Sequence, residues 1–171
     1  MMGSAAAFAH VVLDQPQAAT GSSYKAVFRV SHGCEGLPTT GITVLVPNGV
    51  QGSKPMPKPG WTLAVRRDKL AQPYSSHGRQ ITDDVVEVRW TAATREAALP
   101  EAYFDEFVLR ATLPDLPGPL WFKVVQTCDD GQRQGRNEWV QIPSEGTSTR
   151  GLKTPAALLQ VEPGDTGHAH H

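Results

Sequence analysis

His10 directly follows a short sequence of the kind that signal peptidases cut. Ala7, Phe8 and Ala9 have the small-x-small form, which places the cleavage just before His10. A histidine at the start of a mature chain has two nitrogen donors, its α-amine and its imidazole Nδ1, that can chelate one metal ion. Both lose their protons readily, with ordinary pKa values of about 8 and about 6.5, and copper(II) stands at the top of the affinity order for such ligands. His10 is therefore a candidate histidine brace for copper(II).

Residues 1–9 are open to two interpretations. They lack the charged start and the apolar run of a complete signal peptide. We favour the remnant of a signal peptide, and the alternative is a leader appended to the chain. In the second case, His10 is an ordinary residue that opens the first strand.

Each of the two cysteines, Cys34 and Cys128, comes just after a segment with strand patterning. In an exported chain, cysteines at matching strand ends indicate one disulfide, which would close a loop of about 94 residues. A pair of thiolate metal ligands and a catalytic cysteine are the alternatives. Against them, the sequence has no Cys-x-x-Cys motif, and the neighbouring His32 alone does not make a cysteine a nucleophile.

The end of the chain differs in character from the rest. Residues 144–164 lose the strand pattern, and His168, His170 and His171 stand within the last four residues. Such a cluster can bind a divalent metal loosely, or it is a solvated end without a native role, such as the remnant of a purification tag. We expect residues 144–171 to form a flexible tail that ends in these histidines.

Composition and charge exclude several classes of function. Apolar residues make up 39% of the 171 residues, which is enough to bury a core. Lys and Arg number 16 against 17 Asp and Glu, so the chain lacks the basic excess of proteins that bind nucleic acid or anionic membranes. No stretch of about 18 apolar residues exists that could span a membrane. The 16 glycines and 14 prolines are spread along the chain as turn residues, which is typical of an all-β domain.

Period-2 alternation recurs along the body of the chain. The clearest case is Tyr24–Val30, where the apolar residues share one face while Lys25 and Arg29 lie on the other. Strands are expected at 24–30, 42–46, 61–65, 86–90, 107–112, 120–126 and 138–142. Residues 94–99 indicate a single helical turn. Short strands separated by turn residues predict one β-sandwich domain over residues 10–143.

Five segments of the chain match, in order, the pattern of a known family. They are His10-Val-Val-Leu-Asp-Gln-Pro16, Gly21-Ser-Ser-Tyr-Lys-Ala26, His32-Gly-Cys-Glu-Gly36, Lys54-Pro-Met-Pro-Lys-Pro-Gly-Trp61 and Val124-Val-Gln-Thr-Cys128. Together they resemble the YcnI-like family, whose members are exported bacterial copper-binding proteins. The resemblance extends over about residues 10–143. It implies an immunoglobulin-like or cupredoxin-like β-sandwich with copper(II) bound by the mature N-terminal histidine.

The resemblance also implies which residues surround the metal. A tryptophan lies near the metal in the family, and Trp139 occupies the matching position in Asn137-Glu-Trp-Val-Gln-Ile-Pro143. An indole has no lone pair for ordinary ligation, so we expect this ring to act as a lid over the cation, with core packing as the alternative. Many members carry an acidic residue shortly after the leading histidine. This chain has Gln17 there, and Asp14 is the nearest acidic substitute.

Two further residues are candidates for roles at the site. His32, beside Cys34, is either a second metal ligand or a loop histidine with partners of its own. Gln126, at the end of a predicted strand, either orients the site through its amide or forms a hydrogen bond within a turn.

These observations favour an exported copper(II)-binding protein, a copper chaperone or buffer in the periplasm or outside the cell, and not an enzyme. Copper(II) is the expected cofactor, and the expected partners are the copper ion and other periplasmic copper chaperones or transporters. Two other classes stay open. One is a copper oxidase with a brace like that of polysaccharide monooxygenases, which needs a second histidine that no motif here supplies. The other is a metal-free interaction module on the same β-sandwich.

Overall fold

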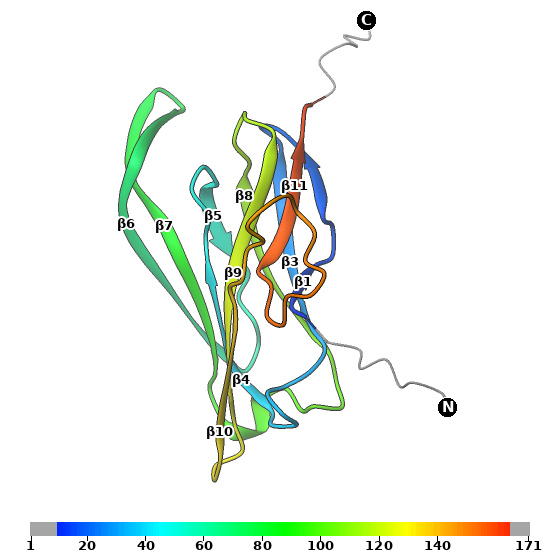
Figure 1. Ribbon diagram of the computed structural model, residues 1–171. Coiled ribbons are helices and arrows are strands. Elements are labelled where there is room, and N and C mark those ends of the chain that lie inside the picture. The colour runs from blue at the N-terminus through cyan, green and yellow to red at the C-terminus, as the bar shows by residue number, and fades with distance from the viewer. Residues whose placement is uncertain (1–9, 165–171) are drawn as a thin grey trace, which may run out of the picture.

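Residues 10–164, the part of the chain that the computed structural model describes, form two β-sheets packed face to face (Figure 1). The smaller sheet has the strand order β1-β3-β8-β5, and the larger has the order β2-β11-β9-β4-β7-β6, with β10 also paired to β9. The strands of the smaller sheet are β1 (Val12–Leu13), β3 (Ser23–Val30), β8 (Asp105–Thr112) and β5 (Gln51–Pro55). Those of the larger sheet are β2 (Gln17–Ala19), β11 (Ala157–Glu162), β9 (Gly118–Asp129), β4 (Thr39–Leu45), β7 (Arg79–Ala92), β6 (Trp61–Ser76) and β10 (Gln134–Trp139).

The core lies between the two sheets and is built from inward-facing aromatic and branched side chains. Phe28 of β3 packs edge-on against Phe122 of β9, with ring centroids 5.4 Å apart. Phe107 of β8 packs in the same way against Trp90 of β7 at 5.7 Å. All four rings are almost completely buried. The alternation read from the sequence therefore supplies the inner faces of both sheets.

The longest hairpin of the larger sheet is formed by β6 and β7, with 16 and 14 residues. It turns at His77 and Gly78, which both have positive φ, at 50° and 76°. This is the backbone of the two-residue turns that match the twist of paired strands. Figure 1 shows the tip of the hairpin projecting past the neighbouring β5.

A disulfide between Cys34 and Cys128 joins the two sheets, with their Cα atoms 5.8 Å apart. Cys34 lies in the loop after β3, and Cys128 lies near the end of β9. Gly135 of β10 pairs with Cys128, and a Cβ on this glycine would come within 2.8 Å of the Cys34 Cβ. The predicted disulfide is confirmed in the structure, and Gly135 gives it room.

The predicted strands are confirmed in place, with longer bounds in most cases. The helical turn expected at 94–99 is a 3-10 turn at Arg95–Ala97, which Thr94 caps by accepting a hydrogen bond from the Ala97 amide. The last predicted strand, 138–142, is shifted: β10 ends at Trp139. The reason is that β10 pairs with residues 124–129 of β9, whereas β11 pairs with residues 118–122. The chain after Trp139 therefore finds this part of β9 already occupied.

The predicted domain boundary at Pro143 and the flexible tail from 144 are wrong for the described residues. β11 pairs antiparallel with β9 and parallel with β2, and its Ala157, Leu159 and Val161 are buried in the core. The sandwich therefore extends to about Glu162, because the larger sheet needs this strand to bridge β2 and β9. The predicted leader at 1–9 and the histidines at 168–171 lie outside the described residues.

Candidate metal centre

His10 lies directly before β1, and its ring is close to that of Trp139. The two ring centroids are 5.7 Å apart, with the planes inclined by 53°. Trp139 is the last residue of β10 and is only 7% exposed, whereas His10 is partly exposed. The structure thus places two predicted site residues, His10 and Trp139, side by side although they lie far apart in the sequence.

Trp139 is held in place by a hydrogen bond from its indole. Its Nε1 donates to Oε1 of Gln126 at 3.1 Å. Trp139 lies opposite Val124 in the pairing of β10 with β9, so its strand runs directly beside the strand that carries Gln126. Because the N–H is already used, the indole can present only its ring to a group bound at His10.

Gln126 is the centre of a buried hydrogen-bond network. Its Nε2 donates to the carbonyl oxygen of His32 at 2.6 Å and to Oγ1 of Thr39 at 2.8 Å. Its Oε1 also receives a longer hydrogen bond from Nδ2 of Asn137, at 3.5 Å. Gln126 is 1% exposed, so these partners replace water completely. The amide of Gln126 thus binds both the Trp139 indole and the backbone of the loop that carries His32.

The side chain of His32 is engaged elsewhere. Its Nδ1 lies 3.0 Å from Oε1 of Glu101, and the amide of Gly33 donates to the other oxygen of the same carboxylate. Partial burial would raise the pKa of Glu101, but the hydrogen bonds from His32 and Gly33 outweigh it and lower the pKa below its usual value. This geometry agrees with a loop histidine that has partners of its own.

Asp14 and Gln17 are both exposed. Oδ1 of Asp14 is 3.4 Å from Nη1 of Arg29, so the carboxylate is directed to the neighbouring strand β3. Gln17 is the first residue of β2 and pairs with Gln160 of β11. Neither contact involves His10.

A small cavity of about 170 Å³ borders His10. One side is formed by the first strand, including Leu13, and the other by Thr147, Thr149 and Ala156 from the loop between β10 and β11. These residues could not be predicted from the sequence pattern, which places the loop in the tail. Only the return of β11 into the sheet places the loop beside His10.

The donor set at this site is small. Within residues 10–164, no group of three or more His, Cys, Asp and Glu side chains is arranged to hold a metal ion. A metal ion at His10 would therefore have the imidazole and an α-amine of this residue as its nitrogen donors. That amine exists only in a chain whose first nine residues have been removed.

A model of the family described as "Domain of unknown function (DUF1775)" matches residues 10–161. The chain belongs to the DUF1775 family. The DUF1775 match begins at His10 and ends within β11, in agreement with a sandwich that continues past Pro143. No match was found among curated proteins.

A solved structure extends the comparison to the fold of this DUF1775 chain. It is a crystal structure of an uncharacterized protein from Nocardia farcinica, described as having an immunoglobulin-like fold. The two are 29% identical with a TM-score of 0.65, over 89% of this chain and 97% of the other. The predicted all-β, immunoglobulin-like sandwich is confirmed. In the described part of the chain, no helix is long and apolar enough to cross a membrane.

Proposed function

We propose that this DUF1775 protein is an exported copper(II)-binding protein that uses a histidine brace at His10. In the mature chain, the α-amine and Nδ1 of His10 chelate the ion, and Trp139 covers one side. Copper is the cargo, and the protein is a chaperone or buffer in copper homeostasis rather than an enzyme. The observation that carries the proposal is the proximity of the His10 and Trp139 rings, whose centroids are 5.7 Å apart.

Trp139 belongs to the hydrophobic core, and its place beside His10 also suits a role at a metal site. Trp139 is buried and its N–H is bound by Gln126, so the ring has a fixed orientation beside a partly exposed imidazole. A fixed aromatic face next to a cation attracts it and limits the approach of water. The resemblance of the sequence to the YcnI-like family supports the same assignment.

The expected location is the periplasm or the outside of the cell. A disulfide such as Cys34–Cys128 persists in oxidising compartments and is rare in the cytosol. Removal of the leader and formation of this bridge would both accompany export. The expected partners are other copper chaperones or transporters that deliver or receive the ion.

The test is a copper(II) titration of the chain that begins at a free His10, with His168, His170 and His171 replaced by Ala. These substitutions remove the competing histidines at the end of the chain. We expect one copper(II) ion to bind at micromolar or lower concentration and to quench part of the tryptophan emission. His10→Ala abolishes the binding, and Trp139→Phe removes the quenched component and weakens binding.

The matched control is the same protein with residues 1–9 retained. Its His10 nitrogen is an amide instead of an amine, while the sequence from His10 onward is the same. We expect it to bind copper(II) far more weakly. Equal binding by this longer chain would exclude the brace, and no uptake by either chain would leave a metal-free interaction module.

A further inference from the structure

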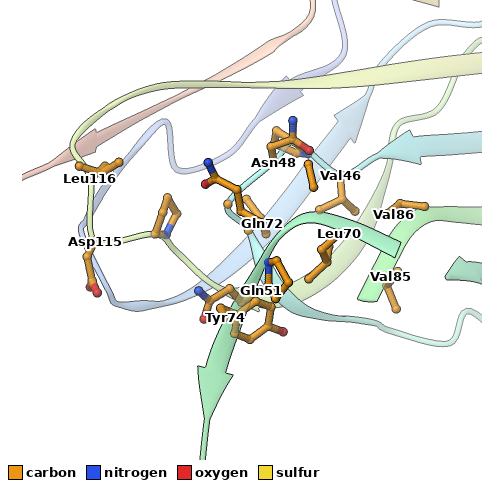
Figure 2. Close-up of a pocket in the computed structure, with 16 residues that line it drawn as sticks. Val46, Asn48, Gln51, Leu70, Gln72, Tyr74, Val85, Val86, Asp115 and Leu116 are labelled. Atoms are coloured by element: carbon orange, nitrogen blue, oxygen red, sulfur yellow. The ribbon is translucent and has the colours of Figure 1, made fainter. Parts of the chain in front are cut away.

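A second cavity, of about 430 Å³, lies beside the β6–β7 hairpin. Four segments surround it: residues 46–51 from the β4–β5 loop to the start of β5, residues 70–74 of β6, Val85 and Val86 of β7, and residues 114–116 between β8 and β9 (Figure 2). Cavities that bind small molecules in proteins commonly measure about 300–1000 Å³. His10, Trp139 and Gln126 lie on other segments, so the two sites are separate.

The walls of this cavity are apolar with a few amide groups. The side chains that define its character are Val46, Leu70 and Val86, together with the amides of Asn48, Gln51 and Gln72. Among the described residues that line it, Asp115 alone is charged. Its Oδ1 sits beside Gly21, where an added Cβ would come within 2.7 Å, and Figure 2 shows Asp115 at the edge of the group. The cavity therefore offers hydrogen bonds to its occupant, and its one charge is the negative charge of Asp115 at the edge.

A buried carboxylate holds three of the walls together. Asp84 of β7 is 4% exposed and accepts hydrogen bonds from the Gly52 amide of β5 at 2.9 Å and from the Tyr74 hydroxyl of β6 at 2.5 Å. Burial and the bond to Asp84 raise the pKa of Tyr74 to about 12, so the phenol keeps its proton and continues to donate at neutral pH. Val46 is in turn bound through its amide to the carbonyl of Val86, at 3.0 Å. These bonds hold β5, β6, β7 and the loop after β4 in place around the cavity.

We infer that this cavity is a binding site for a small organic molecule without negative charge. The ligand is apolar over most of its surface and carries a hydrogen-bonding group that the amides of Asn48, Gln51 and Gln72 can reach. An anionic group would lose its hydration without gaining a cationic partner, and Asp115 would repel it, so the cavity strongly disfavours negative charge. The inference goes beyond the copper site and does not depend on it.

The test compares two fluorescent probes that differ only in charge. N-phenyl-1-naphthylamine is neutral, and 1-anilinonaphthalene-8-sulfonate is the same skeleton with a sulfonate. We expect the neutral probe to bind the full chain with one-to-one stoichiometry, and the anionic probe to bind at least about tenfold more weakly. No saturable binding of the neutral probe, or equal binding of both, would overturn the inference.

Substitutions locate the probe. Val86→Trp fills the cavity from β7, and Ala71→Trp fills it from an exposed position of β6, where folding is least at risk. Val65→Trp is the matched control, because Val65 is 47% exposed on β6 and is not part of the lining. We expect the first two to reduce the affinity at least about tenfold and the third to leave it unchanged.

Two readouts make the result decisive. Circular dichroism checks the fold of each variant, and if Val86→Trp does not fold, Ala71→Trp alone decides. A folded Ala71→Trp protein that binds the neutral probe as well as the unmodified chain would contradict the inference. His10→Ala must retain full probe binding, so failure of the copper proposal and failure of this one are told apart.

Discussion

Gln126 is the residue on which the candidate metal centre depends most. It is buried, and its amide reaches the backbone of His32, the hydroxyl of Thr39 and the indole of Trp139. Its two N–H groups face acceptors, and its oxygen faces donors, so the amide can adopt only one orientation. A side chain of the same shape without these groups would leave buried partners unsatisfied, which costs more than the bonds contribute when made.

We therefore predict that Gln126→Leu lowers the free energy of unfolding by about 1–3 kcal/mol. It should also shift the emission of Trp139, because the indole N–H loses its acceptor. Denaturation in urea and the emission spectrum measure the two effects. Gln134→Leu is the control: Gln134 is an exposed residue of β10, and its change should stay within about 0.5 kcal/mol. Similar losses in both variants would contradict the assigned role.

At this scale the sequence predicted residue types better than partners. His10 and Trp139 were paired through the resemblance to a family, and the structure brings their rings together. The hydrogen bond from Gln126 to the His32 carbonyl, 94 positions away, could not be predicted. It depends on how the loop after β3 approaches β9, and no local pattern encodes this approach.

At the scale of elements, β11 shows where local pattern fails. Its residues alternate, with Ala157, Leu159 and Val161 inward, but the strand follows a loop of more than ten residues without any pattern. A short strand so far from any other patterned segment is easily assigned to a tail. Its pairing with β9 and β2 gives it a stabilising role that only the assembled sheet reveals.

If β11 is an integral strand, removing one of its inward side chains must weaken the whole domain. Leu159 is completely buried, so we predict that Leu159→Ala lowers the free energy of unfolding by about 2–5 kcal/mol. Gln160, the next residue on the same strand, points away from the core, and Gln160→Ala should cost less than about 0.5 kcal/mol. Urea unfolding of the two variants makes the comparison. Equal and small effects would restore the boundary at Pro143.

At the scale of the whole molecule, the disulfide links the stability of the sandwich to the candidate site. It joins the two sheets, and each cysteine stands two residues from a member of the Gln126 network: Cys34 follows His32, and Cys128 follows Gln126. The bridge therefore fixes the loop whose carbonyl Gln126 binds. It acts on the unfolded chain as well, because it closes a loop of 94 positions.

We predict that the double variant Cys34→Ala, Cys128→Ala loses about 4–5 kcal/mol of unfolding free energy, the value expected for a loop of this length. Urea unfolding of the variant against the oxidised protein measures the loss, and the reduced unmodified protein is the control that keeps both cysteines. Because the loop after β3 is then less restrained, the variant should also quench less on copper(II) addition, even where it is fully folded. A folded variant with unchanged quenching would show that the Gln126 network orients Trp139 without help from the bridge.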